Sequence, residues 1–365
     1  MYHLPQKATL APFISLNTYL NKKEIFIIPL IITLSFKQLK MEYFFAYFFY
    51  FYKKRKIMRW NLIQASSRLI CVLLLLSCNH QETQNLMPKK SFSLAMVQME
   101  VEAGNPDNNL QRAEKRIEQA APKGAKIALL PELIDLGWTD PSARTMAYEI
   151  PNGKTCKRLQ KAAAKNKIFV CAGIVEKEYD RTFNSAVIIN PKGEVILKHR
   201  KLNELDIAHD LYDQGDRLGV VSTPVGTLGL FICADATARA NSLAHALGYM
   251  GADVILSPCA WAVQPGYNNQ LTPYGDTWRK TYADVSSQFD LWVFGVSNVG
   301  KIKKGPWKDW DCIGNSLAFA PGGKEVAQAP FGVNADTIIY VDVKINERPA
   351  RGTTWYNFWS DKTSE

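Results

Sequence analysis

The side chain best suited to act as a nucleophile in this sequence is Cys233. It ends an apolar run over residues 229–233 and is followed directly by Ala234 and then by helical spacing over residues 239–250. A thiol at a strand-to-helix turn lies near the free N–H groups at the start of the helix, and these groups favour thiolate over thiol. Free cysteine is also among the most often buried residue types, so Cys233 alone does not establish an active site.

Two further strand ends carry charged side chains that could assist a thiol. Glu132 follows the apolar segment 126–130, and Lys201 follows the segment 195–198. A carboxylate can accept the proton of a thiol and return it to a leaving nitrogen, and a fixed ammonium can stabilise an oxyanion. The three residue types together are suited to cleave an amide bond through a covalent intermediate.

The histidines and the other cysteines could indicate a cysteine–histidine hydrolase, a metal site or a redox dithiol, but their positions in the sequence favour none of the three. His209 could serve a cysteine–histidine hydrolase of the papain type, but the local signatures of such enzymes are absent around Cys233. His199 and His245 are therefore interpreted as structural residues. The cysteines after residue 78 form no Cys-x-x-Cys pair and histidines are few, so we predict no metal site, no redox dithiol and no cofactor.

Helical and strand patterns alternate along the chain after residue 90, although several strands follow one another directly. Helices are predicted over residues 108–121, 153–165, 239–250 and 277–289. Strands are predicted over residues 93–99, 126–130, 168–175, 183–189, 195–198, 228–233, 254–256, 291–297, 315–319 and 337–343. A purely βαβ arrangement does not fit this order, so we expect a layered α/β architecture with mixed sheets and outer helices.

The net charge of +10 comes mainly from the start of the chain. Residues 1–78 hold 11 Lys and Arg but only 2 Asp and Glu, which leaves 33 basic and 32 acidic residues for the remainder. A nearly neutral body lacks the electrostatic footprint of a nucleic-acid-binding protein, so no nucleic-acid partner is expected.

Residues 58–78 have the pattern of a secretory signal. Basic residues precede the apolar run 69–76, and the segment closes on Leu75-Leu76-Ser77-Cys78, which resembles a bacterial lipobox. The resemblance implies that Cys78 is lipidated, so that the protein is exported and lipid-anchored to a membrane of the cell envelope. An ordinary signal peptide stays open as the alternative.

The rest of the chain then divides into three parts. Residues 1–57 are interpreted as an over-extended start that does not belong to the fold, and residues 79–90 as a flexible polar tether. Residues 91–365 form the predicted domain, which is long enough to bury a substantial core.

Taken together, three segments resemble the nitrilase, or carbon-nitrogen hydrolase, superfamily. They are Leu129-Leu130-Pro131-Glu132-Leu133, Lys198-His199-Arg200-Lys201 and Leu230-Phe231-Ile232-Cys233-Ala234-Asp235. Their order and spacing agree with the family pattern, and weaker supporting stretches extend the resemblance over about Ser91 to Val343. The resemblance implies an α/β fold, an α-β-β-α sandwich with two mixed sheets and outer helices.

The same resemblance implies roles for individual residues. Glu132 would be the general base, Lys201 the group that stabilises the tetrahedral intermediate, and Cys233 the nucleophile. The backbone N–H of Ala234 would help to hold the oxyanion. Members often use a second acidic residue after the lysine, and Asp210 is the better match to that position, with Glu204 as the second choice.

The activity implied is hydrolysis of the C–N bond of a small linear amide through a thioester. Nitrile hydrolysis and N-carbamoyl amino acid hydrolysis stay open within the family, and a catalytically inactive cell-envelope binding protein stays open outside it. The expected partners are a small-molecule substrate and, by resemblance, further copies of the chain in a homo-oligomer. Four aromatic residues near loop ends either line the substrate pocket or fill the core, namely Trp138, Trp261, Tyr267 and Trp355.

Overall fold

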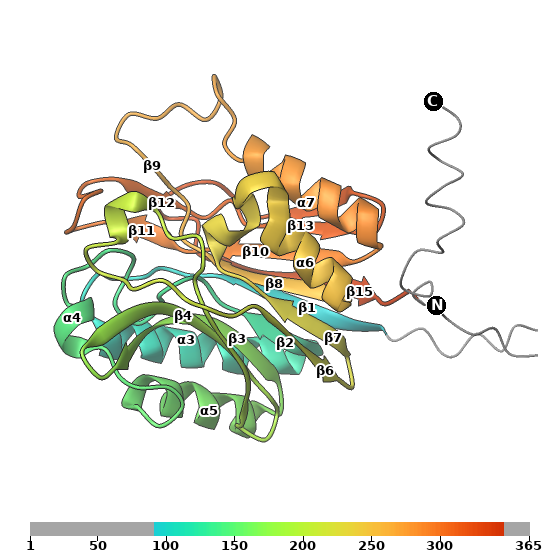
Figure 1. Cartoon of the computed structure of the whole chain (residues 1–365), viewed down its shortest axis with the longest axis horizontal. Helices are drawn as coiled ribbons and strands as arrows, with labels where there is room; N and C mark the ends of the chain where they lie inside the picture. Colours follow the sequence, from blue (N-terminus) through green and yellow to red (C-terminus); the bar gives the residue numbers. More distant parts are fainter. Residues whose placement is uncertain (1–90, 347–365) are drawn as a thin grey trace, which may run out of the picture. The chain divides into compact units, whose positions relative to one another are not determined.

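The computed structural model describes residues 91–346, which form two six-stranded β-sheets packed face to face with helices outside them (Figure 1). The first sheet contains, in spatial order, β15 (Thr337–Lys344), β1 (Ser91–Gln98), β2 (Ala125–Leu129), β3 (Phe169–Glu178), β4 (Arg181–Ile189) and β5 (Val195–Arg200). The second contains β14 (Lys324–Gln328), β13 (Leu317–Ala320), β10 (Trp292–Ser297), β8 (Val254–Cys259), β7 (Gly226–Leu230) and β6 (Gly219–Thr223).

Both sheets are mixed. The central strands β1, β2 and β3 of the first sheet and β7, β8 and β10 of the second pair in parallel, while the outer strands pair antiparallel. A separate three-stranded sheet consists of β11 (Val299–Lys301), β12 (Asp311–Ile313) and β9 (Ala262–Val263). The predicted sandwich of two mixed sheets is therefore confirmed.

Helices cover the outer faces of the two large sheets (Figure 1). The first sheet is covered by α3 (Pro106–Ala120) and α5 (Lys154–Asn166), and the second by α6 (Ser242–Met250) and α7 (Asp276–Phe289). The short helical segments are α4 (Ala143–Met146), η1 (Ala121–Lys123), η2 (Asp206–Ala208), η3 (Cys233–Thr237) and η4 (Arg239–Asn241). Within residues 91–346, no helix combines the length and the apolar composition that crossing a bilayer requires.

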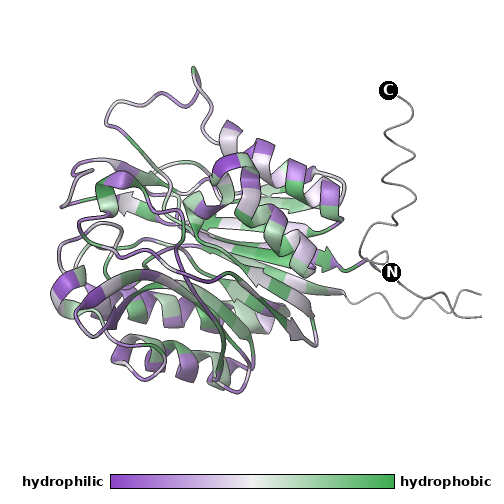
Figure 2. Cartoon of the chain, viewed as in Figure 1, coloured by the Kyte–Doolittle hydropathy of each residue, from purple (hydrophilic) through white to green (hydrophobic). Residues whose placement is uncertain are grey.

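Strand β1 shows how the sequence produces these layers. Leu94 and Met96 pack into the core between the two sheets, whereas Ala95 and Val97 pack into the core beneath α3 and α5. Side chains alternate between the faces of a strand, so a sheet covered on both sides needs continuous apolar strands. Figure 2 shows the resulting hydrophobic strands inside and hydrophilic outer faces on the helices.

Helix α3 follows from local signals. Asn105 is its N-cap, and Pro106 occupies a position where a missing N–H costs nothing. Leu110 and Ile117 lie on the buried stripe, and Gly124 adopts the left-handed conformation just beyond η1. The predicted helix was therefore placed correctly to within two residues.

The segment around Cys233 differs from its prediction. The strand predicted over residues 228–233 ends at Leu230, and Cys233 itself lies in the 3₁₀ turn η3. The helix predicted over residues 239–250 starts only at Ser242, because Ala240 and Asn241 have φ values of 56° and 53°, outside the α-helical region. The edge strands β6 and β14 were not predicted.

Asp135 is a buried carboxyl group just after β2. It is 1% exposed, and its Oδ1 accepts hydrogen bonds from the backbone N–H groups of Leu136 at 3.0 Å and Val175 at 3.1 Å. Burial raises its pKa from 3.8 to about 7, although these hydrogen bonds act in the opposite direction. Because the folded pKa is raised, Asp135 contributes stability below about pH 4, and this contribution is lost as the pH rises through about 7.

We therefore expect Asp135→Asn to remove part of the pH dependence of folding. Asparagine keeps an oxygen for the two N–H groups but carries no charge, so the free energy of unfolding of the variant relative to the native chain should rise between pH 4.5 and pH 8, by about 1.4 kcal/mol for each pKa unit. Urea denaturation at both pH values measures this difference. The exposed Asp342→Asn serves as the control, and equal pH slopes in all three proteins would contradict the prediction.

Candidate active site

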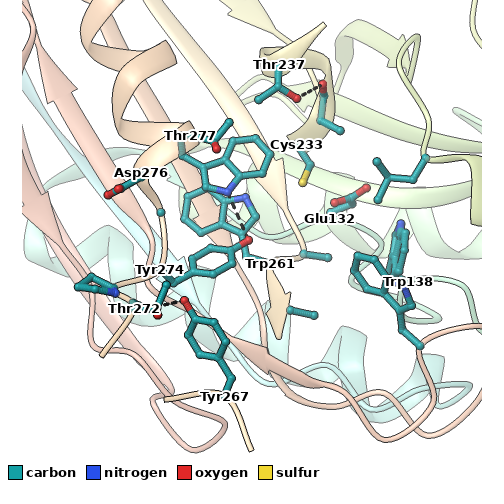
Figure 3. Close-up of a pocket in the computed structure, with 18 of the residues that line it drawn as sticks. Glu132, Trp138, Cys233, Thr237, Trp261, Tyr267, Thr272, Tyr274, Asp276 and Thr277 are labelled. Atoms are coloured by element: carbon teal, nitrogen blue, oxygen red, sulfur yellow. Dashed lines mark hydrogen bonds between the residues drawn. The ribbon is translucent and has the colours of Figure 1, made fainter. Parts of the chain in front are cut away.

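The three predicted chemical groups lie at strand ends that meet at one cavity. Glu132 follows β2 and Lys201 follows β5, both in the first sheet, whereas Cys233 follows β7 in the second. All three side chains line a cavity of about 430 Å³. Figure 3 shows Glu132 and Cys233 in its wall. They are nearly buried, with Glu132 1%, Lys201 2% and Cys233 8% exposed.

The two carboxyl oxygens of Glu132 have different surroundings. Oε1 accepts hydrogen bonds from Lys201 Nζ at 2.9 Å and from Asn184 Nδ2 at 2.7 Å. Oε2 is buried without a hydrogen-bond partner among the described residues. Figure 3 shows this carboxyl group and the sulfur of Cys233 directed toward each other. Glu132 therefore has one anchored oxygen and one that is free to exchange a proton.

The backbone of Glu132 is fixed by a close approach to Gly173 of β3. A Cβ atom at Gly173 would lie 2.6 Å from the Cα of Glu132, so only glycine fits there. The carbonyl of Gly173 also accepts a hydrogen bond from Ile134 N at 2.8 Å, and its N–H donates to Pro131 O at 2.9 Å. Gly173 thus allows β3 to pack directly against the loop that carries the Glu132 carboxylate.

Lys201 lies between two carboxylates. Its Nζ donates to Glu132 Oε1 at 2.9 Å and to Glu204 Oε1 at 3.0 Å, while Asn184 bridges the same two acids through Glu204 Oε2 at 2.9 Å. Burial alone would lower the pKa of Lys201, but Glu132 and Glu204 outweigh it, and the pKa lies well above the ordinary value. The two carboxylates therefore favour the charged ammonium and hold it in place.

The second acid at the lysine is Glu204 and not Asp210. Glu204 is 8% exposed and bonded to Lys201, whereas Asp210 is exposed and does not line the cavity. The chain turns through η2 between the two residues, which directs Asp210 toward solvent. The preference for Asp210 followed from the resemblance to the family pattern, and a match by position in the sequence does not reveal the turn between the two acids.

We expect the two acids to respond differently to neutral substitution. Glu204→Gln should lower kcat/KM by roughly 10- to 100-fold, because it removes one of the two charges that hold the Lys201 ammonium in position. Asp210→Asn should stay within about 2-fold of the native chain, as is usual for an exposed side chain away from the reacting atoms. Steady-state hydrolysis rates measure both variants, and a larger loss in Asp210→Asn would reverse the assignment.

Cys233 adopts a strained backbone conformation at the start of η3. Its φ is 44°, in the left-handed region that non-glycine residues seldom occupy, and its N–H donates to Ser257 Oγ at 3.2 Å. Ala234 follows directly and also lines the cavity. The turn brings both the thiol and the start of a short helical segment to the same space.

The surroundings of Cys233 in the structure favour the thiol and not the thiolate that its place at a turn suggested. The neighbouring Cys259 thiol, burial and the charge of Glu132 raise the pKa of Cys233 well above its ordinary value, although Lys201 acts in the opposite direction. Because η3 is only five residues long and Lys201 is already paired with two acids, neither is enough to favour the thiolate. Cys233 therefore rests as a thiol, and a base is needed to activate it.

Asp235 connects the turn of Cys233 to the loop of Lys201. Its Oδ2 accepts from Ile232 N at 2.9 Å, and its Oδ1 accepts from Leu202 N at 3.0 Å and Asn203 N at 2.7 Å. His199 Nε2 contacts the same carboxylate at 2.8 Å. Burial alone would raise the pKa of Asp235, but His199 and the backbone donors hold it below its usual range. Asp235 thus joins the strand end of the second sheet to the loop that follows β5 of the first sheet.

Aromatic side chains form much of the cavity wall. The predicted Trp138, Trp261 and Tyr267 all line it, and three further aromatic residues that were not predicted line it too, namely Tyr274, Trp278 and Trp307. Helical spacing in α7 gave no reason to separate Trp278 from core residues. Trp355 and the proposed lipidation site Cys78 lie outside the described residues.

No group of three or more His, Cys, Asp and Glu side chains suited to a metal ion occurs in residues 91–346. The cysteines of this part of the chain are free and buried, namely Cys156, Cys171, Cys233, Cys259 and Cys312.

A family model described as carbon-nitrogen hydrolase matches residues 93–350 of the sequence. The chain belongs to the carbon-nitrogen hydrolase family. The match includes the cavity and all three strand ends described above. The resemblance to the nitrilase superfamily is therefore confirmed, and the chain is a nitrilase-superfamily hydrolase by family.

Individual relatives share limited identity with this carbon-nitrogen hydrolase. A nitrilase from Pyrococcus abyssi is 35% identical over 170 residues, and nitrilase homolog 2 from Dictyostelium discoideum is 32% identical over 190 residues. These matches cover 45% and 49% of this chain and span only 63% and 57% of the two relatives. The omega-amidase NIT2 from Bos taurus is 27% identical over 70% of this chain and 90% of its own length.

Solved structures of the superfamily share the fold. Nit3 from Saccharomyces cerevisiae matches with a TM-score of 0.59 and 24% identity, over 70% of this chain and 90% of its own. An amidase from Nesterenkonia sp. AN1, with an acetamide moiety added covalently at its active site cysteine, matches with a TM-score of 0.59 and 18% identity. That match covers 71% of this chain and 93% of the amidase.

Proposed function

We propose that this carbon-nitrogen hydrolase is an amidase that cleaves small linear amides through a thioester on Cys233. The observation that carries the proposal is that Oε2 of Glu132 has no hydrogen-bond partner within residues 91–346 and faces the sulfur of Cys233, in a cavity that the ammonium of Lys201 also lines. Because the pKa of the Cys233 thiol is raised, a base must remove its proton before the sulfur can attack. Oε2 of Glu132 can accept this proton. Omega-amidases among the relatives support the hydrolysis of an amide bond in general.

In the proposed first half-reaction, Oε2 of Glu132 accepts the proton of Cys233 and the sulfur attacks the amide carbonyl carbon. Lys201 and the N–H of Ala234 stabilise the oxyanion that forms. Glu132 then passes the proton to the nitrogen, the C–N bond breaks, and ammonia or an amine leaves. The acyl group stays on the sulfur as a thioester.

In the second half-reaction, Glu132 accepts a proton from water and the resulting hydroxide attacks the thioester carbon. The C–S bond breaks when the tetrahedral intermediate collapses, and the proton on Glu132 returns to the sulfur. The carboxylic acid leaves and the thiol is restored. The net change is one amide and one water converted to one acid and one ammonia or amine, with no oxidation or reduction.

A panel of purified substrates tests this function. Ammonia release from simple amides, N-carbamoyl amino acids and nitriles should be fastest with the amides, and Cys233→Ala should abolish it. Turnover of nitriles or carbamoyl amino acids without turnover of amides would replace the proposed substrate class. Failure to release ammonia from any member of the panel would favour the inactive binding protein.

For the cellular location, we propose export and lipid anchoring through Cys78. The support is the Leu75-Leu76-Ser77-Cys78 pattern after a basic and apolar segment, which resembles a lipobox. Metabolic labelling with palmitate should mark the full-length native chain and leave Cys78→Ala unlabelled. Homo-oligomeric assembly stays a prediction from the resemblance.

A further inference from the structure

Two groups of aromatic rings face the cavity. Trp138 and Trp307 form one group, with ring centroids 4.6 Å apart, and Trp310 stacks behind Trp307 at 4.3 Å. Trp261 and Trp278 belong to the other group and stack at 5.2 Å. Figure 3 shows Trp138 on one side of the space beside Cys233 and Glu132, and Trp261 with Tyr274 on the other.

Hydrogen bonds and packing hold the second group in position. Tyr274 OH accepts a hydrogen bond from Trp278 Nε1 at 3.3 Å, and its carbonyl accepts one from Arg279 at 2.9 Å. Its backbone N–H donates to Asn269 Oδ1 at 2.8 Å. Trp261 is 1% exposed and stacks on Trp278, so its ring is packed on almost all sides and cannot move. Rings that are fixed in this way can bind a flat apolar group at a low entropic cost.

The charges that line the cavity disfavour a negatively charged substrate. Glu132 and Asp276 both line it, and the lining ammonium of Lys201 is already paired with Glu132 and Glu204. A carboxylate on the substrate would enter a space where negative charge is in excess. It would lose hydration without gaining a free positive partner among the described lining residues.

We propose that the preferred substrates are uncharged primary amides whose acyl chain ends in an aromatic ring. The amide carbon would lie at Cys233 and the ring would lie between the two aromatic groups. This inference rests on the proposed amidase function and adds a substrate class to it. Edge-to-face and offset contacts with indole and phenol rings, together with burial of the ring, provide the preference.

Four primary amides test the substrate class, namely hydrocinnamamide, butyramide, succinamate and the cationic β-alaninamide. We expect kcat/KM for hydrocinnamamide to exceed that for butyramide by at least about 10-fold, and that for succinamate to be the lowest. Equal or faster hydrolysis of succinamate or β-alaninamide would overturn the inference. If butyramide is hydrolysed in a Cys233-dependent reaction and hydrocinnamamide is hydrolysed no faster, the substrate class is wrong. The proposed amidase function would still stand.

Variants connect the preference to the rings. Trp138→Leu should lower the ratio of kcat/KM for hydrocinnamamide to that for butyramide by at least about 3-fold, because one wall of the ring site is removed. The matched control is Tyr249→Leu, since Tyr249 is 70% exposed on α6 and does not line the cavity. An unchanged ratio in Trp138→Leu would contradict the placement of the ring.

A binding measurement keeps the inference testable even if no amide is hydrolysed. Hydrocinnamamide should bind the Cys233→Ala variant at least about 10-fold more tightly than succinamate does, as measured by calorimetry. Equal affinities, or tighter binding of succinamate, would overturn the inference whatever the outcome of the activity assays.

Discussion

Replacing Cys233 with alanine is expected to lower kcat for amide hydrolysis by at least about 10⁴-fold, the scale seen when a nucleophile is removed from a covalent mechanism. The thioester cannot form without the sulfur, and the cavity offers no other thiol among its lining residues. The KM should change much less than kcat, because the walls that contact the rest of the substrate are untouched. Ammonia release under saturating substrate measures the effect.

The control for Cys233→Ala is Cys156→Ala. Cys156 is a buried thiol on α5, packed against the outer face of the first sheet, so its loss tests the effect of removing a buried sulfur away from the cavity. Activity should be close to native in this variant after correction for folded protein. Substantial activity in Cys233→Ala would exclude the thioester mechanism.

Glu132→Gln is expected to lower kcat by roughly 10²- to 10⁴-fold, the range of a lost general acid and base. The glutamine oxygen can still accept hydrogen bonds from Lys201 and Asn184, but its amide nitrogen cannot accept the proton of Cys233. The geometry of the cavity is kept while proton transfer is removed. Parallel measurement of kcat and KM separates this outcome from a general loss of structure, because KM should stay within a few-fold of the native value.

The pH profile adds a second readout for Glu132. Burial raises the pKa of this carboxyl group above its ordinary value, with Glu204 acting in the same direction, although Lys201 and Asn184 oppose the rise. The protonated acid cannot serve as a base, so the native activity should fall as the pH decreases through this raised pKa. This acidic limb should be absent from the residual activity of Glu132→Gln, and the exposed Glu118→Gln on α3 should retain it.

Much of the fold could be predicted because its signals are local. Continuous apolar strands and amphipathic helices such as α3 were visible in the sequence, and the resemblance supplied the order of the layers. Strand β14 was missed because Lys324–Gln328 forms an edge strand of mostly exposed residues, which lacks the apolar signal of a buried strand. The start of α6 at Ser242 was not predicted. The left-handed conformation of Ala240 and Asn241, which precede it, cannot be recognised from their residue types.

The site was predictable only where residue types are distinctive. Glu132, Lys201 and Cys233 stand at strand ends, and the structure brings them to one cavity. The choice between Glu204 and Asp210 depended on a turn, and the protonation state of Cys233 depended on burial and on its neighbour Cys259. Both are properties of packing that the sequence does not display.

The bond between Glu132 N–H and Cys259 O, at 3.1 Å, has a consequence for how this protein would lose activity. Together with the contacts of Asp235 to Leu202 and Asn203, it fastens one sheet to the other beside the reacting atoms. If these bonds broke, the two sheets could shift relative to each other. A small shift would separate the Cys233 sulfur from the Glu132 carboxylate while every strand stayed intact. Turnover would then fail on warming before circular dichroism registered any loss of secondary structure.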